Sequence, residues 1–484
     1  MLFNSYIFIL LFLPLTFSVY FLLNRLSYRG GKVWLAGMSL WFYAYFNLYY
    51  LPIIAGSILF NYFAGKLIKK EIKINRRKLY LALSVIMNLG ALFYYKYFDF
   101  FISNVNNIFK TGFTLRYLIL PLAISFFTFK QIAYIVDCYR GEVPEYNFLD
   151  YTLFVIFFPQ LIVGPILFHD ELIPQFQDKE KKRVSYENLA KGLMAFSLGL
   201  GKKVLLADTF ARAADWGYGN VEMLDTASAL LVMLFYTFRI YFDFSGYCDM
   251  AIGLGLMFNI TITQNFDSPY QALSVTDFWQ RWHITLTRFF RRYLYIPLGG
   301  NRKGEVRTYL NLFAVFLVSG LWHGANYTFI LWGAIHGFLF AVTRMFQKQI
   351  DSVNKIIRWL ITFFLINLTW VYFRAESISQ ANEVIRKIFM FDFDGSYLNL
   401  IETFKITEAM LVDRLIKLPF FADYELYFWL MTIFAFIAII FMKNINERIL
   451  SFKPRLASML VTVVLLIWGI LSFSEITAFI YVGF

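Results

Sequence analysis

The segment 309–342 reads YLNLFAVFLVSGLWHGANYTFILWGAIHGFLFAV, two apolar runs joined by a short stretch of small and polar residues. It contains no Asp, Glu, Lys or Arg. Each run approaches the length of about 20 mostly apolar residues that a membrane-spanning helix needs. Because a bilayer core holds no water to pair with the backbone, such runs predict α-helices. His323 lies in the stretch that joins them.

Apolar runs extend along the whole chain. Its 484 residues are 59% hydrophobic and 16% charged, whereas soluble domains are roughly 45–50% apolar and 25% charged. Further runs lie at 2–23, 33–65, 79–95, 117–136, 151–168, 189–206, 227–240, 356–372, 427–442 and 456–473. The sequence therefore predicts an all-α, polytopic membrane protein. We expect one integral membrane domain over residues 1–484, with no repeat and no second domain.

Clusters of basic residues orient these helices, since cytoplasmic loops collect Lys and Arg. Three bases lie at 25–32, seven at 66–78 and four at 443–455. With all three clusters in the cytoplasm, 33–65 becomes a hairpin that turns near Pro52. Both termini are then extracytoplasmic, including the tail 475–484. The run 2–23 has no basic segment before it, which favours a retained helix over a cleaved signal peptide.

The net charge of +13 is explained by the Lys and Arg residues that cytoplasmic loops collect. No folded basic domain is evident, so the sequence predicts no nucleic-acid partner. The chain has only two cysteines and four scattered histidines. They predict neither a disulfide framework nor a metal site.

The run 151–168 contains Pro159 and the pair Gly164-Pro165, which interrupt a helix. Non-helical backbone at membrane depth persists only where protein or a water-filled cavity surrounds it. We therefore expect a broken or re-entrant segment that lines a cavity. A kinked spanning helix is the alternative, because membrane helices tolerate proline.

Histidines are the first candidates for chemistry, because an ionisable group at membrane depth predicts a function. The four are His169, His283, His323 and His336. A proton-transfer residue works best with a pKa near the operating pH, and histidine starts closest to it. His323 is flanked by Gly320 and Gly324, which permit close approach of a backbone or a ligand. A hydrogen-bonded packing residue is the alternative.

The segment 277–307 carries seven Lys and Arg residues interleaved with aromatic residues. Guanidinium groups grip phosphate bidentately. We therefore expect the phosphates of a cytoplasmic donor to be bound by Arg281, Arg288, Arg291 and Arg292. An interfacial helix on anionic membrane lipid is the alternative, and both interpretations can hold together.

Several short motifs in order resemble the membrane-bound O-acyltransferase family, in its bacterial branch. They are SFFTF at 125–129, DCYRG at 137–141, FPQLIVGP at 158–165, DFSGYCDMA at 243–251, RWH at 281–283 and LWHG at 321–324. The resemblance covers nearly the whole chain. It implies a ring of about 11–13 transmembrane or re-entrant helices around a central tunnel. In that tunnel a cytoplasmic thioester would meet an acceptor from the other face.

The resemblance also implies roles for particular residues. His323 would be the catalytic histidine and His283 a second catalytic residue, with Asn326 near the donor. The residues expected to line the tunnel are Pro159, Gln160, Gly164, Pro165, Asp243, Ser245, Asp249 and His336. For the stretches around Gly164 and 243–249, close glycine packing is the structural alternative.

The chain ends Phe479-Ile480-Tyr481-Val482-Gly483-Phe484. This resembles a Phe-Ile/Leu-Tyr-x-x-Phe ending within the same branch, whose tyrosine is proposed to take the acyl group and pass it on. A phenol can carry an acyl group when a base accepts its proton. Tyr481 is therefore a candidate catalytic residue. An aromatic anchor at the membrane interface is the alternative.

These expectations combine into a bacterial inner-membrane O-acyltransferase. Its donor substrate would be acetyl-CoA, with no bound cofactor, and its product would supply a separate extracytoplasmic O-acetyltransferase that modifies a polysaccharide. Peptidoglycan is the first expectation and alginate or another exported polysaccharide the second. Teichoic-acid D-alanylation, from a carrier-protein thioester, is the third. A transporter or flippase and a noncatalytic scaffold are the alternatives from other classes.

Overall fold

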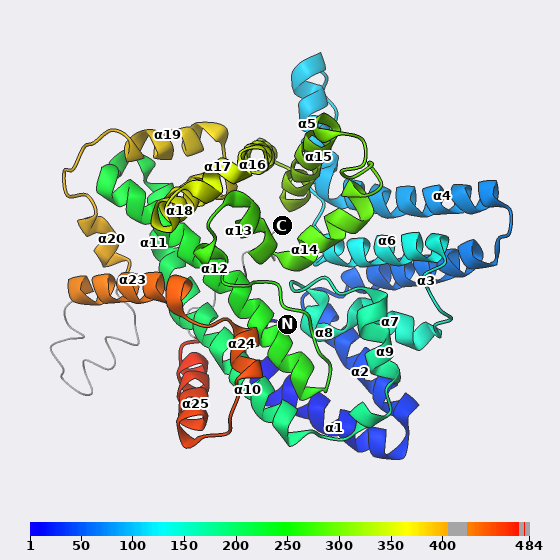
Figure 1. Ribbon diagram of the computed structural model, residues 1–484. Helices are drawn as coiled ribbons and strands as arrows, with labels where there is room; N and C mark the ends of the chain where they lie inside the picture. The colour runs from blue at the N-terminus through cyan, green and yellow to red at the C-terminus, as the bar shows by residue number, and fades with distance from the viewer. Residues whose placement is uncertain (405–423, 474–478, 480–484) are drawn as a thin grey trace.

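The computed structural model describes residues 1–404, 424–473 and 479. Within these residues the regular structure is entirely helical, without a β-strand (Figure 1). Seven segments are long and apolar enough to span a membrane: Phe8–Leu26, Tyr50–Lys70, Ile74–Phe109, Thr226–Met257, Tyr327–Met345, Lys355–Arg374 and Tyr424–Phe441. The prediction of an all-α, multi-pass membrane protein is confirmed.

The N-terminal helices form hairpins. They are η1 (Phe8–Phe12), α1 (Leu13–Leu26), α2 (Tyr28–Ala44), α3 (Tyr50–Lys70), α4 (Ile74–Leu92), η2 (Phe93–Tyr97) and α5 (Phe98–Phe109). The run 33–65 is a hairpin, as predicted. Pro52 lies in the first turn of α3, where the missing N–H of proline costs no helical hydrogen bond.

The next segment contains the expected broken run. Its helices are α6 (Ile124–Arg140), α7 (Phe148–Ile156), α8 (Phe158–Leu161) and α9 (His169–Gln177). The residues 162–168 between α8 and α9 are not helical, yet all are buried. The run 151–168 is therefore interrupted as its proline and glycine residues predicted.

Two helices that pack against each other, α10 (Tyr186–Gly201) and α12 (Thr226–Met257), form the centre of the molecule. The elements here are η3 (Glu180–Lys182), α10 (Tyr186–Gly201), η4 (Lys202–Ala207), α11 (Asp208–Gly219), η5 (Val221–Met223) and α12 (Thr226–Met257). In the most apolar stretch of α12, 72% of the residues are buried. The same share is at most 39% in the other candidate membrane spans, so α12 is the interior helix. The sequence predicted helix only over 227–240, but α12 continues through the glycine-containing segment to Met257.

The remaining elements surround this pair (Figure 1). Those that carry site residues are η6 (Pro269–Gln271), α13 (Val275–Arg281), α14 (Ile284–Phe290), η7 (Arg291–Tyr295), α15 (Glu305–His323), α16 (Tyr327–Met345), α17 (Gln347–Ser352), α18 (Lys355–Arg374) and α19 (Ile378–Ile388). Beyond them come α20 (Leu398–Glu402), α23 (Tyr424–Phe441), α24 (Ile445–Leu450) and α25 (Leu456–Leu471).

Glycines bring α10 and α12 into backbone contact. A Cβ atom at Gly199 would lie 2.5 Å from the carbonyl oxygen of Gly246 and 2.7 Å from the backbone nitrogen of Met250. Gly192 faces Gly253 in the same way about two helical turns further along. Small residues at such positions let membrane helices approach closely.

We expect Gly199→Ala to destabilise the protein by about 1–3 kcal/mol, because the added methyl group has no space between the two backbones. The matched control is Gly90→Ala on α4, where a Cβ atom meets nothing within 4 Å. There alanine should be neutral or stabilising by up to about 1 kcal/mol. Thermal unfolding in detergent measures both, and equal melting temperatures for the two variants would contradict this account of the α10–α12 contact.

Candidate active site

His323 is the last residue of α15 and is 2% exposed. Its ring lies against Trp332 and Phe373, with centroids 5.3 and 5.0 Å away. The helix ends at Gly324, and α16 folds back against α15 at once. A Cβ atom at Gly324 would collide with the Phe329 ring. The small residues around His323 therefore allow the tight reversal that encloses it.

The end of α15 is held by Lys96 of η2. Its ammonium donates to the carbonyl oxygens of Trp322 at 2.6 Å and His323 at 3.3 Å. The last carbonyls of a helix have no partner within the helix and carry the negative end of its dipole, so a cation satisfies them well. Sequence reasoning did not select Lys96, although a lysine within FYYKYF at 93–98 is a charged group in apolar surroundings.

His283 lies between α13 and α14 and is fully buried. Its backbone has φ 47° and ψ 50°, a left-handed conformation that is uncommon for residues other than glycine. Such outliers cluster at functional sites, where the surrounding structure holds them in place.

Asn265 fixes the tautomer of His283. The side-chain oxygen of Asn265 accepts hydrogen bonds from the Thr285 backbone N–H at 3.2 Å and from the Thr285 hydroxyl at 2.9 Å. The same oxygen lies 3.1 Å from Nδ1 of His283. Because a carbonyl oxygen only accepts, Nδ1 must carry the proton, and Nε2 is the basic nitrogen. Nothing in the sequence around Asn265 distinguished it.

The two histidines predicted to be catalytic are brought together across Trp322. Its ring centroid is 4.9 Å from that of His323 and 6.2 Å from that of His283. They come from separate segments, 40 residues apart in the sequence numbering. Phe244 of α12 packs edge to face against the His283 ring, with the two ring centroids 4.8 Å apart.

The other two histidines have different surroundings. Nδ1 of His336 accepts a hydrogen bond from the Trp279 indole at 3.1 Å. The Trp332 ring lies between His336 and His323, 4.7 and 5.3 Å from their centroids. His169 is elsewhere, in a buried network with Asp137 at 3.3 Å and Tyr146 at 3.1 Å.

The predicted donor-binding residues do not form one cluster. Arg288 pairs with both carboxylate oxygens of Glu171 at 2.7 Å. Arg292 pairs with Asp137 at 3.0 Å and Glu142 at 2.6 Å, and both guanidiniums lie over the Phe168 ring.

Of the other three donor-binding candidates, Arg291 is next to Arg292 in η7, whereas Arg281 and Asn326 contact other residues. Arg281 pairs with Asp277 at 2.7 Å, and Arg291 is exposed. Asn326 caps α16 three residues beyond His323 and donates to the Glu376 carbonyl at 2.9 Å.

The predicted tunnel residues divide into two groups. Pro159, Gln160, Gly164 and Pro165 are buried in or after α8. Asp243 and Asp249 are buried on α12 but are paired with lysines of η4, at 2.6 Å from Lys203 and 2.6 Å from Lys202. Ser245 lies 3.5 Å from Lys202. Within this stretch of α12, Phe244 touches His283.

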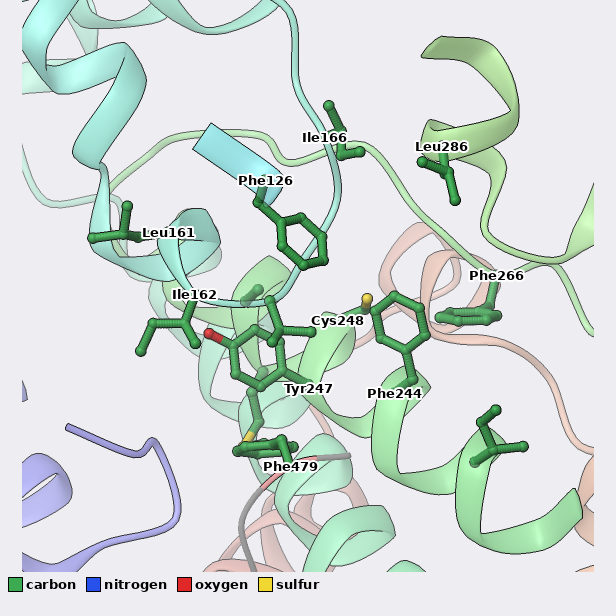
Figure 2. Packing of buried hydrophobic residues seen from close by; sticks show 14 of the residues in the cluster. Phe126, Leu161, Ile162, Ile166, Phe244, Tyr247, Cys248, Phe266, Leu286 and Phe479 are labelled. Carbon is green, nitrogen blue, oxygen red and sulfur yellow. The ribbon is translucent and has the colours of Figure 1, made fainter. Parts of the chain in front are cut away.

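Phe479 is the residue of the tail that the structure describes, and it lies inside the protein. Phe479 is 2% exposed and packs edge to face on Tyr247, with centroids 4.6 Å apart (Figure 2). The ammonium of Lys203 lies 4.7 Å from the Phe479 ring centroid. Tyr481 lies outside the described residues.

Apolar helices that enclose a group of buried histidines define a polytopic membrane protein with a polar interior. Comparison with known proteins gives its family: residues 124–378 match the membrane-bound O-acyltransferase family. The chain belongs to that family and is an O-acyltransferase, as its motifs indicated.

Three named relatives place the chain within the family. It is 48% identical to the peptidoglycan O-acetyltransferase of Helicobacter pylori, over 80% of this chain and 79% of that protein. It is 39% identical to the probable alginate O-acetylase of Pseudomonas aeruginosa, over 88% and 82% of the two chains. The teichoic acid D-alanyltransferase of Bacillus subtilis is 27% identical over 49% of this chain and 62% of that protein.

Replacing Asn265 by leucine should lower acyl-transfer activity at least about tenfold, a change of roughly 1.4 kcal/mol in the barrier, because His283 loses the acceptor that sets its tautomer. Asn265→Asp keeps that acceptor and should retain more activity than the leucine variant. Initial rates of donor hydrolysis by purified protein measure both. Full activity in a folded Asn265→Leu variant would show that acyl transfer does not depend on the tautomer of His283.

Proposed function

We propose that this chain transfers acetyl groups across the bacterial inner membrane for O-acetylation of peptidoglycan. The observation that carries the proposal is the burial of His323 beside His283 at the interior end of α15. The 48% identity to a peptidoglycan O-acetyltransferase supports peptidoglycan as the polymer that is acetylated. The basic clusters support an orientation with both termini extracytoplasmic.

In the proposed reaction His323 acts as general base. It takes the proton of an acceptor hydroxyl, whose oxygen attacks the thioester carbonyl of acetyl-CoA. An O–C bond forms, the C–S bond breaks, and the departing thiolate takes a proton back from the histidine. His283, oriented by Asn265, assists at the same centre. A water-excluded site strengthens such interactions.

The donor phosphates are proposed to bind the arginine block at 281–303. Arg288 and Arg292 over Phe168 form its most organised part. Their carboxylate partners hold the guanidiniums in place before the donor arrives. The exposed Arg291 adds a cation that makes no hydrogen bond or ion pair through its side chain among the described residues.

The acceptor is proposed to be Tyr481. Phe479 contacts Tyr247, which lies one helical turn from Phe244, the residue that touches His283. Tyr481 follows Phe479 by two residues in the sequence, which supports Tyr481 as the acceptor. The acetyl-tyrosine would then supply a separate extracytoplasmic O-acetyltransferase.

Alginate or another exported polysaccharide is the second candidate acceptor, favoured by 39% identity over 88% of this chain. Teichoic-acid D-alanylation is the third, with a match over about half of the chain.

For His323→Ala we expect the rate of acetyl-CoA hydrolysis to fall at least about 100-fold, the usual contribution of a general base. The assay uses purified protein and radiolabelled acetyl-CoA, with gel filtration and thermal unfolding to show that the variant is folded. A folded variant with wild-type turnover would remove His323 from the chemistry. No turnover by the wild type would point instead to a carrier-protein thioester. Substrate movement that survives loss of His323 would favour a transporter.

Tyr481→Phe should abolish covalent labelling of the chain by the radiolabelled acetyl group and stop acetylation of the polymer in cells, because phenylalanine has no oxygen to acylate. Tyr117→Phe, at a side chain that is 78% exposed, makes the same chemical change away from the tail and should behave as wild type. Full polymer acetylation in cells that carry Tyr481→Phe would overturn the relay and favour an aromatic anchor.

A further inference from the structure

A cavity of about 550 Å³ lies along a face of α12 that carries Tyr241, Phe242 and Asp249. One wall is formed by α10, η4, α11 and α12, and the other by α23, α24 and α25. Neither His283 nor His323 lines it. The first wall lies within the residues that match the family, 124–378, and the second lies beyond them. The cavity therefore lies between the part of the chain that matches the family and the C-terminal helices. Figure 1 shows these helices, α23, α24 and α25, beside that part of the chain.

The cavity extends along α23. The residues of α23 that line it recur every three or four positions, so one face of the helix borders it, and Met442 continues the series directly after the helix: Tyr427, Met431, Phe434, Ala438 and Met442. The 15-residue separation of the first and last corresponds to about 22 Å along a helix. Leu198, Leu465 and Trp468 face them from the other helices. An elongated apolar slot of this length accommodates a fatty-acyl chain.

One end of the slot is basic. Lys443 and Arg448 line it from the turn after α23, and the Nε atom of Arg448 donates to the Lys443 carbonyl at 3.1 Å. The ammonium of Lys443 makes no hydrogen bond or ion pair with any other residue that the structure describes. The turn at 443–455 carries four bases between two apolar helices, which is typical of the membrane interface.

The acidic residues of the cavity do not cancel this charge. Asp249 is held by Lys202 at 2.6 Å and Asp208 by Lys203 at 2.8 Å. Arg448 lies close enough to Lys202 and Asp249 to interact with both. Counting Lys202, Arg212, Lys443 and Arg448 against Asp208 and Asp249, the lining has a surplus of two positive charges.

We propose that this slot binds one anionic phospholipid of the surrounding bilayer. An acyl chain lies along α23 between the core and the C-terminal helices, and the phosphate lies between Lys443 and Arg448. The volume falls in the range of about 300–1,000 Å³ that is usual for small-molecule sites. The lipid bridges the family core and the helices that lead to the tail. The inference does not depend on the reaction or the polymer proposed above.

The test is native mass spectrometry of the full-length protein, delipidated in detergent and then given palmitoyl-oleoyl phosphatidylglycerol or phosphatidylcholine. We expect the wild type to retain one phosphatidylglycerol in preference to phosphatidylcholine. K443Q/R448Q should bind phosphatidylglycerol about thirty-fold more weakly, since each base near an anionic headgroup contributes about 1 kcal/mol, or about fivefold in affinity. K453Q/R455Q removes two exposed bases of the same turn that do not line the slot, and should match the wild type.

A second pair of variants tests the acyl chain. Ala438→Trp fills the slot and should abolish retention of either lipid, whereas Ile437→Trp, on the exposed face of α23, should not. Equal retention of the two lipids by the wild type, or undiminished phosphatidylglycerol binding by K443Q/R448Q, would overturn the proposal. Displacement of the lipid by inorganic phosphate would show an ion site and not a lipid site. Because the readout is binding, it separates this inference from failure of the acetyl-transfer assay.

Discussion

Backbone groups in hydrocarbon must find their hydrogen-bond partners within the protein, and this constraint governs how a site can exist here. A helix that ends inside the membrane leaves its last carbonyls without partners. At α15 the ammonium of Lys96 meets the carbonyls of Trp322 and His323. That contact permits the chain to reverse at Gly324 and to place a histidine at the turn, enclosed by α16 and α18.

The same requirement explains the rest of the centre. His283, whose backbone is left-handed, precedes α14 at a break between two helices. The side-chain oxygen of Asn265 accepts hydrogen bonds from both His283 and Thr285. At both of these breaks a polar side chain from another segment supplies the missing hydrogen-bond partner.

Glycine pairs determine how closely the central helices meet. With Gly199 against Gly246 and Gly192 against Gly253, α12 and α10 pack backbone to backbone. The other faces of α12 carry Phe244 and Tyr247 on one side and, on another, Asp243 and Asp249, which pair with lysines. The histidine centre, the buried Phe479 and the C-terminal cavity are therefore all arranged around one helix. Figure 2 shows Phe244 and Tyr247 on this helix, with Phe479 against Tyr247.

The sequence by itself determined the helical membrane class, the hairpin before Pro52, the interruption of 151–168, the family, and His323 and His283 as candidates. These follow from composition, local breakers and short motifs, which are properties of neighbouring residues. Lys96, Asn265 and the lysine partners of Asp243 and Asp249 were decided only by the tertiary structure. Each acts on a residue at least 18 positions away, and the pairing of buried polar groups depends on how helices pack, which no local pattern records.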